Sequence, residues 1–326
     1  MKLLVTGAAG YIGSVVTEQF VARGDTVVAL DNLQHGHRAA VDARAEFVRG
    51  DLLDGAWLAA YMADHPVDAV VHLAAEALID ESLRDPGRFF RANVTGGLNL
   101  LDAMVAAGVR RIIFSSTAAV YGEPAALPIV ETHPRVPVNS YGASKLMFET
   151  ILDWYWRCHR VRSVSLRYFN ACGATELHGQ YHRPETHIIP ILFDVALGER
   201  AAINLFGTDY DTPDGTCIRD YIHVSDIARA HVLALQSIES MEAHAYNMAN
   251  GTGYSNRDVI ETVRRVTGKE IPVIPAPRRI GDPARLIASS DRIHRELGWE
   301  PQYPDLTTMV ETAWAWRRRY PRGYEA

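Results

Sequence analysis

The residues best suited to chemistry form the stretch Tyr141-Gly142-Ala143-Ser144-Lys145. A tyrosine and a lysine four residues apart lie on the same face of a helix. A free tyrosine ionises far above neutral pH, so a tyrosine that acts as a base needs its pKa lowered, which takes roughly 4 kcal/mol. One cation about 4 Å away at an effective dielectric of about 20 supplies an energy of that order. The pair therefore predicts proton transfer by Tyr141, although an isolated pair of this kind is more often a core tyrosine and a surface lysine.

The first 31 residues have the order expected of a dinucleotide site. An apolar strand (2–5) leads into Gly7-x-x-Gly10-x-x-Gly13, a helix follows to about residue 23, and a strand (26–30) ends at Asp31. Glycines let the backbone approach a pyrophosphate, which the helix N-terminus attracts. A carboxylate at Asp31 accepts hydrogen bonds from a ribose diol and repels a 2′-phosphate, which favours NAD over NADP. The alternative is a tight turn that needs glycine only for its positive φ.

Strands and helices then alternate along the chain. Strands are predicted at 46–49, 68–72, 111–114 and 163–166, and helices at 56–63, up to about 107, and from 141 to about 160. This alternation predicts an α/β fold with a doubly wound, Rossmann-like parallel sheet. Ligands of such sheets bind beyond the C-terminal strand ends, where five candidate residues fall. They are Gly7, Asp31, Asp51, Ala74 and Ser115.

Three of these strand ends carry residues with a specific use. Leu73-Ala74-Ala75 is small enough to let a flat ligand pass, and Asp51 could meet an adenine edge. Ser115-Ser116-Thr117 places hydroxyl groups where they face the cofactor and could bond a substrate hydroxyl. Serine and threonine in this setting also serve as simple turn residues.

The second half of the chain differs from the first half in its pattern of residues. Residues 171–185 form a polar loop, and a helix at 188–197 and a strand at 202–206 begin a new module. We expect a Rossmann domain over 1–170 with a returning segment near 216–248. The rest of 171–326 forms a smaller, discontinuous, mixed α/β substrate domain.

Composition excludes several classes of function. The chain has 326 residues, 48% of them apolar, and a formal charge of -6, which gives no attraction to nucleic acid or to an anionic membrane. Arg317-Arg318-Arg319 is interpreted as a solvated helix end. Three unpaired cysteines, no charged-then-apolar leader and no long apolar run predict a cytoplasmic protein. No zinc motif occurs, and His178 and His182 lie in a loop, so no metal is expected.

Together these motifs carry a family resemblance. The glycine turn, Asp31, Ser115-Ser116-Thr117 and Tyr141-x-x-x-Lys145 resemble the extended short-chain dehydrogenase/reductases that act on nucleotide sugars. Within that group the chain is similar, essentially end to end, to the bacterial UDP-glucose 4-epimerases. The most diagnostic stretch is 214–224, Asp-Gly-Thr-Cys-Ile-Arg-Asp-Tyr-Ile-His-Val.

The resemblance implies a mechanism. Tyr141 removes the proton of the sugar 4-hydroxyl while NAD takes the C4 hydride, and the 4-keto sugar turns over and receives the hydride on its opposite face. Lys145 and the nicotinamide cation hold the tyrosine pKa down, Lys145 anchors the ribose, and Thr117 bonds the reacting oxygen.

The resemblance also assigns contact residues. Those for the cofactor are Gly7, Gly10, Tyr11, Ile12, Gly13, Asp31, Asn32, Asp51, Leu52, Leu73, Ala74, Ala75, Asn93, Ser115, Ser116, Tyr141, Lys145 and Tyr168. Those for the UDP-sugar are Thr117, Asn170, His187, Ile188, Phe206, Arg219, Arg279 and Asp282. A homodimer through the helices near Asn93 and Tyr141 is expected on the same basis.

Three positions depart from the family pattern. Glu76 and Ala77 stand where many members have a lysine near the pyrophosphate. His187 stands where asparagine is common, and Leu286 replaces the tyrosine that gates sugar size in some narrow-specificity members. A smaller, apolar gate would admit N-acetylated sugars.

Two other functions fit parts of the pattern. A nucleotide-sugar 4,6-dehydratase or decarboxylase shares the fold, NAD, Tyr141 and Lys145. Dehydratases carry Asp-Glu directly after the active-site threonine, whereas Ala118-Ala119 follow Thr117 here, and alanine cannot move a proton. An NAD-binding sensor is the non-enzyme alternative, but such proteins commonly lose the reactive tyrosine or lysine.

Overall fold

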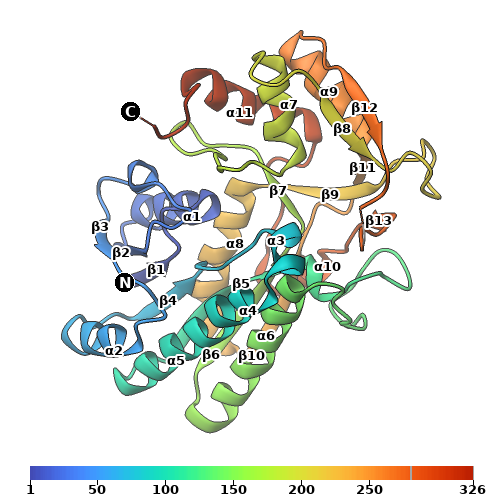
Figure 1. Cartoon of the computed structure of the whole chain (residues 1–326). Helices are drawn as coiled ribbons and strands as arrows, with labels where there is room; N and C mark the ends of the chain where they lie inside the picture. Colours follow the sequence, from blue (N-terminus) through green and yellow to red (C-terminus); the bar gives the residue numbers. More distant parts are fainter. Residues whose placement is uncertain (280, 326) are drawn as a thin grey trace.

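A seven-stranded parallel sheet organises the computed structural model, which describes residues 1–279 and 281–325 (Figure 1). The strands lie in the order β10-β6-β5-β4-β1-β2-β3, and all neighbours are parallel. They are β1 Lys2–Thr6, β2 Thr26–Asp31, β3 Glu46–Arg49, β4 Ala69–His72, β5 Arg111–Thr117, β6 Arg162–Tyr168 and β10 Ala243–Met248. The strand order reverses between β1 and β4, which is the switch point where doubly wound sheets bind ligands. The predicted fold class is confirmed.

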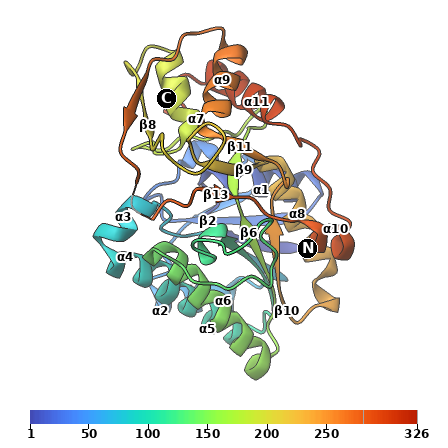
Figure 2. The same ribbon diagram turned by 90° about the vertical axis from the view of Figure 1, so that its right-hand side faces the viewer.

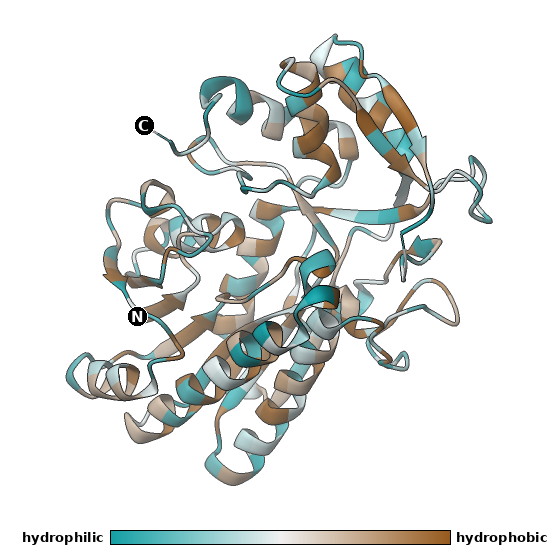
Figure 3. Ribbon diagram, viewed as in Figure 1, coloured by the Kyte–Doolittle hydropathy of each residue, from teal (hydrophilic) through white to brown (hydrophobic). Residues whose placement is uncertain are grey.

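Helices cover both faces of this sheet. One face carries α1 (Tyr11–Ala22), α8 (Val224–Ser237) and α10 (Asp291–Leu297), and the other carries α2 (Gly55–Asp64), α5 (Gly96–Ala106) and α6 (Ser140–His159). Each layer has its own apolar core, with Phe20 and Ile227 in the first and Phe148 in the second. In Figure 3 the hydrophobic colour follows the strands and the helix sides that face them.

The connection between β4 and β5 differs from the single helix predicted there. It consists of α3 (Ile79–Arg84), α4 (Pro86–Phe90) and a π-helical turn (Arg91–Thr95) that leads into α5. Pro86 cannot continue the preceding helix, and the Asp85 side chain accepts the Arg88 amide and starts a new one. The π-helical turn contains Asn93, one of the predicted site residues.

The remaining elements gather above the parallel sheet (Figure 2). Strand β9 (Ile218–His223) is the centre of a second sheet with β7, β11 and β13, and β12 pairs with β8. The bounds are β7 Asn170–Cys172, α7 Ile188–Ala196, β8 Ile203–Phe206, β11 Gly253–Ser255, α9 Asn256–Thr267, β12 Val273–Ala276, β13 Arg285–Leu286 and α11 Leu306–Arg319. β9 lies within the segment near 216–248 that was expected to return to the Rossmann domain. Within 216–248 it joins the second sheet, whereas α8 and β10 return to the first.

The C-terminal arginine run corrects one prediction. Arg317 is not part of a solvated helix end, because only 4% of it is exposed. Its guanidinium donates to Asp194 at 3.1 Å and to Glu199 at 2.7 Å, which ties α11 to the end of α7. The charge is buried because two carboxylates compensate it, and those partners lie more than 100 residues away in the chain.

Candidate active site

The glycine turn packs against the segment that follows β4. Gly7 has a φ of +71°, and a Cβ there would lie 2.5 Å from the Ala74 amide nitrogen. A Cβ on Gly13 would lie 2.0 Å from the Gly7 carbonyl oxygen. Both positions therefore require glycine, and the turn and Leu73-Ala74-Ala75 form one surface. Gly10 is the N-cap of α1 and makes no side-chain cap, so the first amides of the helix have no intrahelical partner.

Asp31 holds the turns on either side of it. Its carboxylate accepts the Ala9 amide at 2.9 Å and the Leu33 amide at 2.8 Å. Burial raises the pKa of Asp31, and these two hydrogen bonds oppose that effect. Beside it, the Asn32 side-chain amide donates to Asp51 at 3.1 Å. The structure thus brings the predicted ribose and adenine residues together at the ends of β2 and β3.

Leu52 and Asn93 take part in packing and hydrogen bonding within the protein. Leu52 belongs to the core beneath α2 and α5. The Asn93 side chain accepts the Glu76 amide at 2.8 Å, and it donates to the Glu76 carbonyl at 3.0 Å and to Ser144 at 2.9 Å. Asn93 therefore fixes the segment after β4 against the start of α6.

Tyr141 lies on the first turn of α6, which Asn139 caps by accepting the Gly142 amide at 2.8 Å. Burial raises the pKa of Tyr141, and a hydrogen bond with the Thr117 side chain opposes that rise. The direction differs from the lowered pKa that the sequence predicted. Thr117 keeps a second role, because its hydroxyl oxygen accepts the Ala119 amide at 3.1 Å.

Lys145 is 2% exposed and donates to the Ser115 carbonyl at 2.9 Å. Burial lowers the pKa of Lys145 to about 7. Since its ammonium bonds β5 and stands 4.8 Å from the centre of the Phe114 ring, Lys145 links the helix of Tyr141 to the strand of Thr117. The predicted surface alternative for this lysine is wrong.

Strand β5 runs through Thr117, three residues beyond its predicted end, so the hydroxyl cluster belongs to the strand and not to a turn. Ser116 donates to Glu149 of α6 at 2.5 Å. Thr117 is in register with Tyr168 of β6, whose hydroxyl bonds His231 of α8 at 2.7 Å. Ser116 and Tyr168 thus direct their hydroxyl groups to neighbouring helices.

Glu76 stands at the position where many members of the family have a lysine. It is 4% exposed, and its carboxylate accepts hydrogen bonds from Gln34 at 2.8 Å and Arg88 at 2.7 Å and contacts His35 at 3.1 Å. Burial alone would raise the pKa of Glu76, but the His35 and Arg88 contacts hold it below its ordinary value. These partners were missed, because no local pattern relates the loop after β2 to α4.

Among the residues predicted to bind the sugar nucleotide, Arg219 lies on β9 and Phe206 on β8, which belong to two different sheets. Arg219 pairs with Asp282 and is in register with Leu286 of β13, so the predicted gate neighbours a predicted phosphate ligand. The Arg279 guanidinium lies 4.3 Å from the centre of the Phe206 ring. The other three candidates are Asn170 on β7 and His187 and Ile188 at the start of α7.

Among the helices of residues 1–279 and 281–325, none combines the length and the apolar character that a membrane span requires.

The sheet, its switch point and the Tyr141–Lys145 pair define a dinucleotide-binding α/β protein of the Rossmann type. The chain belongs to the NAD dependent epimerase/dehydratase family, whose model matches residues 3–249. It is 46% identical over 327 residues to the UDP-glucose 4-epimerase of Lacticaseibacillus casei, with 99% of both chains covered. The resemblance predicted from the sequence is confirmed.

Solved structures agree with this assignment. A crystal structure of a UDP-glucose 4-epimerase matches with a TM-score of 0.97 and 46% identity over 100% of both chains. The UDP-glucose 4-epimerase from Bifidobacterium longum, solved in complex with NAD+ and UDP, matches with a TM-score of 0.94 and 35% identity. That match covers 99% of this chain and 100% of the other.

Proposed function

We propose that the chain is an NAD-dependent isomerase that interconverts UDP-galactose and UDP-glucose through a transient 4-keto sugar. The observation that carries the proposal is the arrangement of Tyr141, Thr117 and Lys145, in a fold whose N-terminal turn has space only for glycine at positions 7 and 13. Its relatives of similar length bear the name UDP-glucose 4-epimerase, and one of them was solved with NAD+ and UDP.

The residues that follow β1 and end β2 fit NAD. Gly7 and Gly13 have no space for a side chain, and the start of α1 offers free amides to a pyrophosphate. Asp31 at the end of β2 suits a ribose diol and repels a 2′-phosphate. Bound NAD supplies reversible hydride transfer at C4 of the sugar.

Tyr141 acts on the proton of the sugar 4-hydroxyl. Because burial disfavours the phenolate, the protein needs groups that stabilise it, and Thr117 is positioned to donate a hydrogen bond. The charge of a nicotinamide cation would add to that stabilisation, as would Lys145 in its protonated form. Lys145 also holds the start of α6 against β5 and would bond the nicotinamide ribose.

The sugar nucleotide binds around β9. Arg219 and Arg279 are suited to a diphosphate, because a guanidinium bonds phosphate oxygens in pairs. Asp282 holds Arg219 ready in the absence of that ligand. Leu286 beside Arg219 leaves an apolar edge that would accept an N-acetyl group, so N-acetylated UDP-sugars are proposed as additional substrates.

The dehydratase alternative is not favoured. Ala118 and Ala119 follow Thr117 in a short 3-10 turn (Ala118–Val120) and offer no acid or base. A sensor has no need of a buried lysine that joins two elements beside a tyrosine, so the enzyme is the preferred reading.

Three further proposals concern the whole chain. The NAD domain comprises 1–170 together with α8 and β10, and the sugar-nucleotide domain comprises the remainder of 171–326. The protein is a homodimer through the α5 and α6 surface. It works in the cytoplasm, in keeping with its three free cysteines, Cys158, Cys172 and Cys217.

The deciding experiment follows UDP-galactose, UDP-glucose, UDP-N-acetylglucosamine and UDP-xylose by NMR with the purified protein and no added cofactor. We expect a 4-epimer of UDP-glucose or UDP-galactose. Tyr141→Phe should lower turnover by at least about 100-fold, the lower end of general acid–base effects, and leave NAD bound. Tyr155→Phe, at the far end of the same helix, is the matched control and should stay near wild type. A 4-keto-6-deoxy product, or no 4-epimer from any of the sugars, would refute the proposal.

A further inference from the structure

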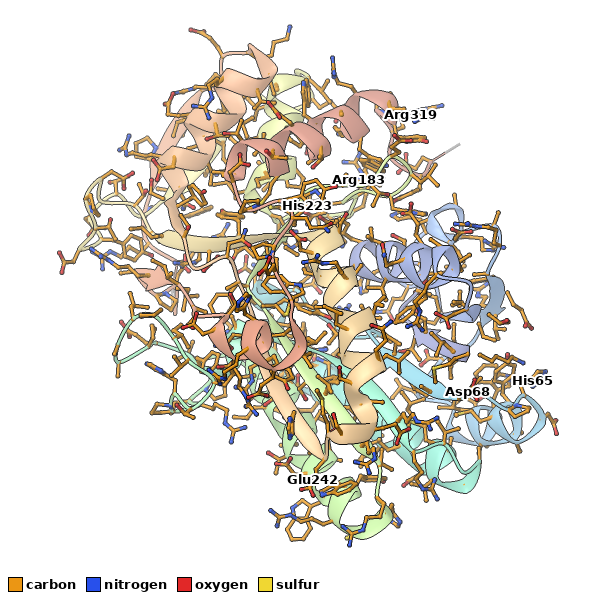
Figure 4. All side chains as sticks on the ribbon, turned by 180° about the vertical axis from the view of Figure 1, so that it is seen from behind. His65, Asp68, Arg183, His223, Glu242 and Arg319 are labelled. Atoms are coloured by element: carbon orange, nitrogen blue, oxygen red, sulfur yellow. The ribbon has the colours of Figure 1, made fainter. Side chains whose placement is uncertain are left out.

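Three side chains converge in the loop before α7. His187 Nδ1 lies 2.7 Å from one Glu185 carboxylate oxygen, and His182 Nδ1 lies 3.7 Å from the other. One ligand atom from each of the three residues lies within 4.8 Å of the other two. Arg183, labelled in Figure 4, marks this loop, which runs beside α11.

These distances are close to those of a metal site. Zinc binds histidine nitrogen at about 2.0–2.1 Å and carboxylate oxygen at about 2.0–2.2 Å, so the ligand atoms of a tetrahedral site stand about 3.3–3.4 Å apart. The separations here are 2.7 Å from His187 to Oε1 of Glu185 and 3.7 Å from His182 to its Oε2, and all three ligand atoms lie within 4.8 Å of one another. Small side-chain rotations would therefore bring all three groups onto one ion.

Glu185 is prepared as a ligand. Its side chain is 7% exposed, and its Oε1 also accepts the amides of Thr186 and His187, each at 2.8 Å. Backbone hydrogen bonds of this kind orient the ligands of metal sites.

Arg183, two residues before Glu185 in the chain, has another partner. Arg183 donates to the Tyr181 hydroxyl at 2.8 and 3.2 Å, and its guanidinium lies over that ring. Glu76, by contrast, has Arg88 as a direct partner of its carboxylate. The two imidazoles around Glu185 stay accessible, because the His182 side chain is 28% exposed and that of His187 is 49% exposed.

We propose that His182, Glu185 and His187 bind one divalent transition-metal ion of the zinc class, with the fourth position open to solvent. Two imidazoles and one carboxylate suit zinc, copper or nickel and are a poor match for magnesium or calcium, which prefer oxygen ligands. The site uses His187, so a bound ion would compete with UDP for that side chain. This consequence rests on the proposed function.

The test titrates zinc chloride into the full-length, chelator-treated protein by calorimetry, in a buffer free of phosphate and nucleotide. We expect one equivalent to bind, visible absorption bands of tetrahedral geometry with Co²⁺, and no heat with Mg²⁺. His182→Gln and Glu185→Gln should each weaken zinc binding by at least about tenfold. His159→Gln, an exposed histidine at the end of α6, is the matched control and should bind as wild type. Circular dichroism confirms that each variant is folded.

Absence of zinc binding, or equal affinity in wild type and His182→Gln, would overturn the site. One equivalent of zinc should lower UDP affinity in wild type but not in His182→Gln, and an unchanged wild-type affinity would refute the competition alone. Because the zinc titration needs neither sugar nor turnover, its failure is separate from failure of the epimerase proposal.

Discussion

At the scale of the residue, Lys145 has the most unusual environment among the candidate catalytic groups. Its ammonium is enclosed between the Phe114 ring and the Ser115 carbonyl, and burial lowers its pKa to about 7. An ordinary lysine titrates near 10.4. The folded protein therefore loses this proton in a range of pH where the unfolded chain still holds it.

This difference predicts how stability depends on pH. Between about pH 7 and pH 10 the unfolded state binds more protons at Lys145, so the free energy of unfolding rises with pH, by at most about 1.4 kcal/mol per pH unit. Lys145→Met removes this contribution, and Lys269→Met, an exposed lysine, retains it. Urea unfolding of nucleotide-free protein at several pH values measures the slope. Parallel curves for wild type and Lys145→Met would contradict the lowered pKa.

Residues whose role depends on local spacing could be predicted from the sequence. Gly7 and Gly13 were predictable, because a turn that admits no side chain selects glycine, and the Tyr141–Lys145 spacing follows from helix geometry. The partners of Glu76 could not be predicted in this way, because Arg88 meets this carboxylate only through the folding of α4. The triad of His182, Glu185 and His187 is local, but its spacing matches no regular zinc motif.

At the scale of the element, an ion pair joins α6 to the sheet. Glu149 of α6 accepts two hydrogen bonds from Arg167 of β6, at 2.9 and 2.6 Å, and one from Ser116 of β5. The side chains of Glu149 and Arg167 are 5% and 3% exposed. Since α6 carries Tyr141 and β5 carries Thr117, this network sets the position of one relative to the other.

Breaking this network should be costly. Glu149→Gln leaves Arg167 buried without its counter-charge, and we expect a loss of about 3–5 kcal/mol of stability. Glu261→Gln removes the partner of Arg264 in an exposed pair on α9 and should cost less than about 1 kcal/mol. Denaturant unfolding of both variants gives the comparison. Equal, small losses would show that the buried pair contributes no more than a surface one.

The predicted elements agree with the structure for β3, with the same bounds, and for α6, within one residue at each end. They disagree where tertiary pairing decides. Strand β9 carries Arg219 and Asp220 in a buried position, because Asp220 accepts the amides of Asn250 and Gly251 at 2.9 and 3.0 Å. No alternation of apolar and polar residues predicts this strand, because the hydrogen-bond partners of its buried Asp220 are backbone amides that lie far away in the sequence.

At the scale of the whole molecule, α6 presents an apolar surface to solvent. Met147 is 46% exposed and Trp154 is 57% exposed, and their spacing of seven residues places them on one side of the helix. Exposed apolar side chains grouped in this way are typical of an interaction surface. They are the observation behind the proposed homodimer.

Charges on this surface should prevent dimerisation. Met147→Glu with Trp154→Glu is expected to sediment as a monomer in analytical ultracentrifugation, because two carboxylates would be desolvated at the interface. Ile274→Glu, which alters a 54% exposed side chain on β12, is the control and should sediment as wild type. A double variant that remains dimeric would place the interface on another surface.

The return of β10 to the sheet also matters while the chain is being made. The ribosome adds 80 residues between Tyr168 and Met248, the last residues of β6 and β10, which takes roughly 4–16 s at about 5–20 residues per second. In a sheet that forms as the chain emerges, β6 would be a bare edge throughout that interval, open to pairing with other chains. Arg162 and Arg167 stand near its two ends, and Glu149 is already available to hold Arg167. The Glu149–Arg167 ion pair would thus keep the edge of the growing sheet from pairing with other chains, before it positions α6 relative to β5 in the finished protein.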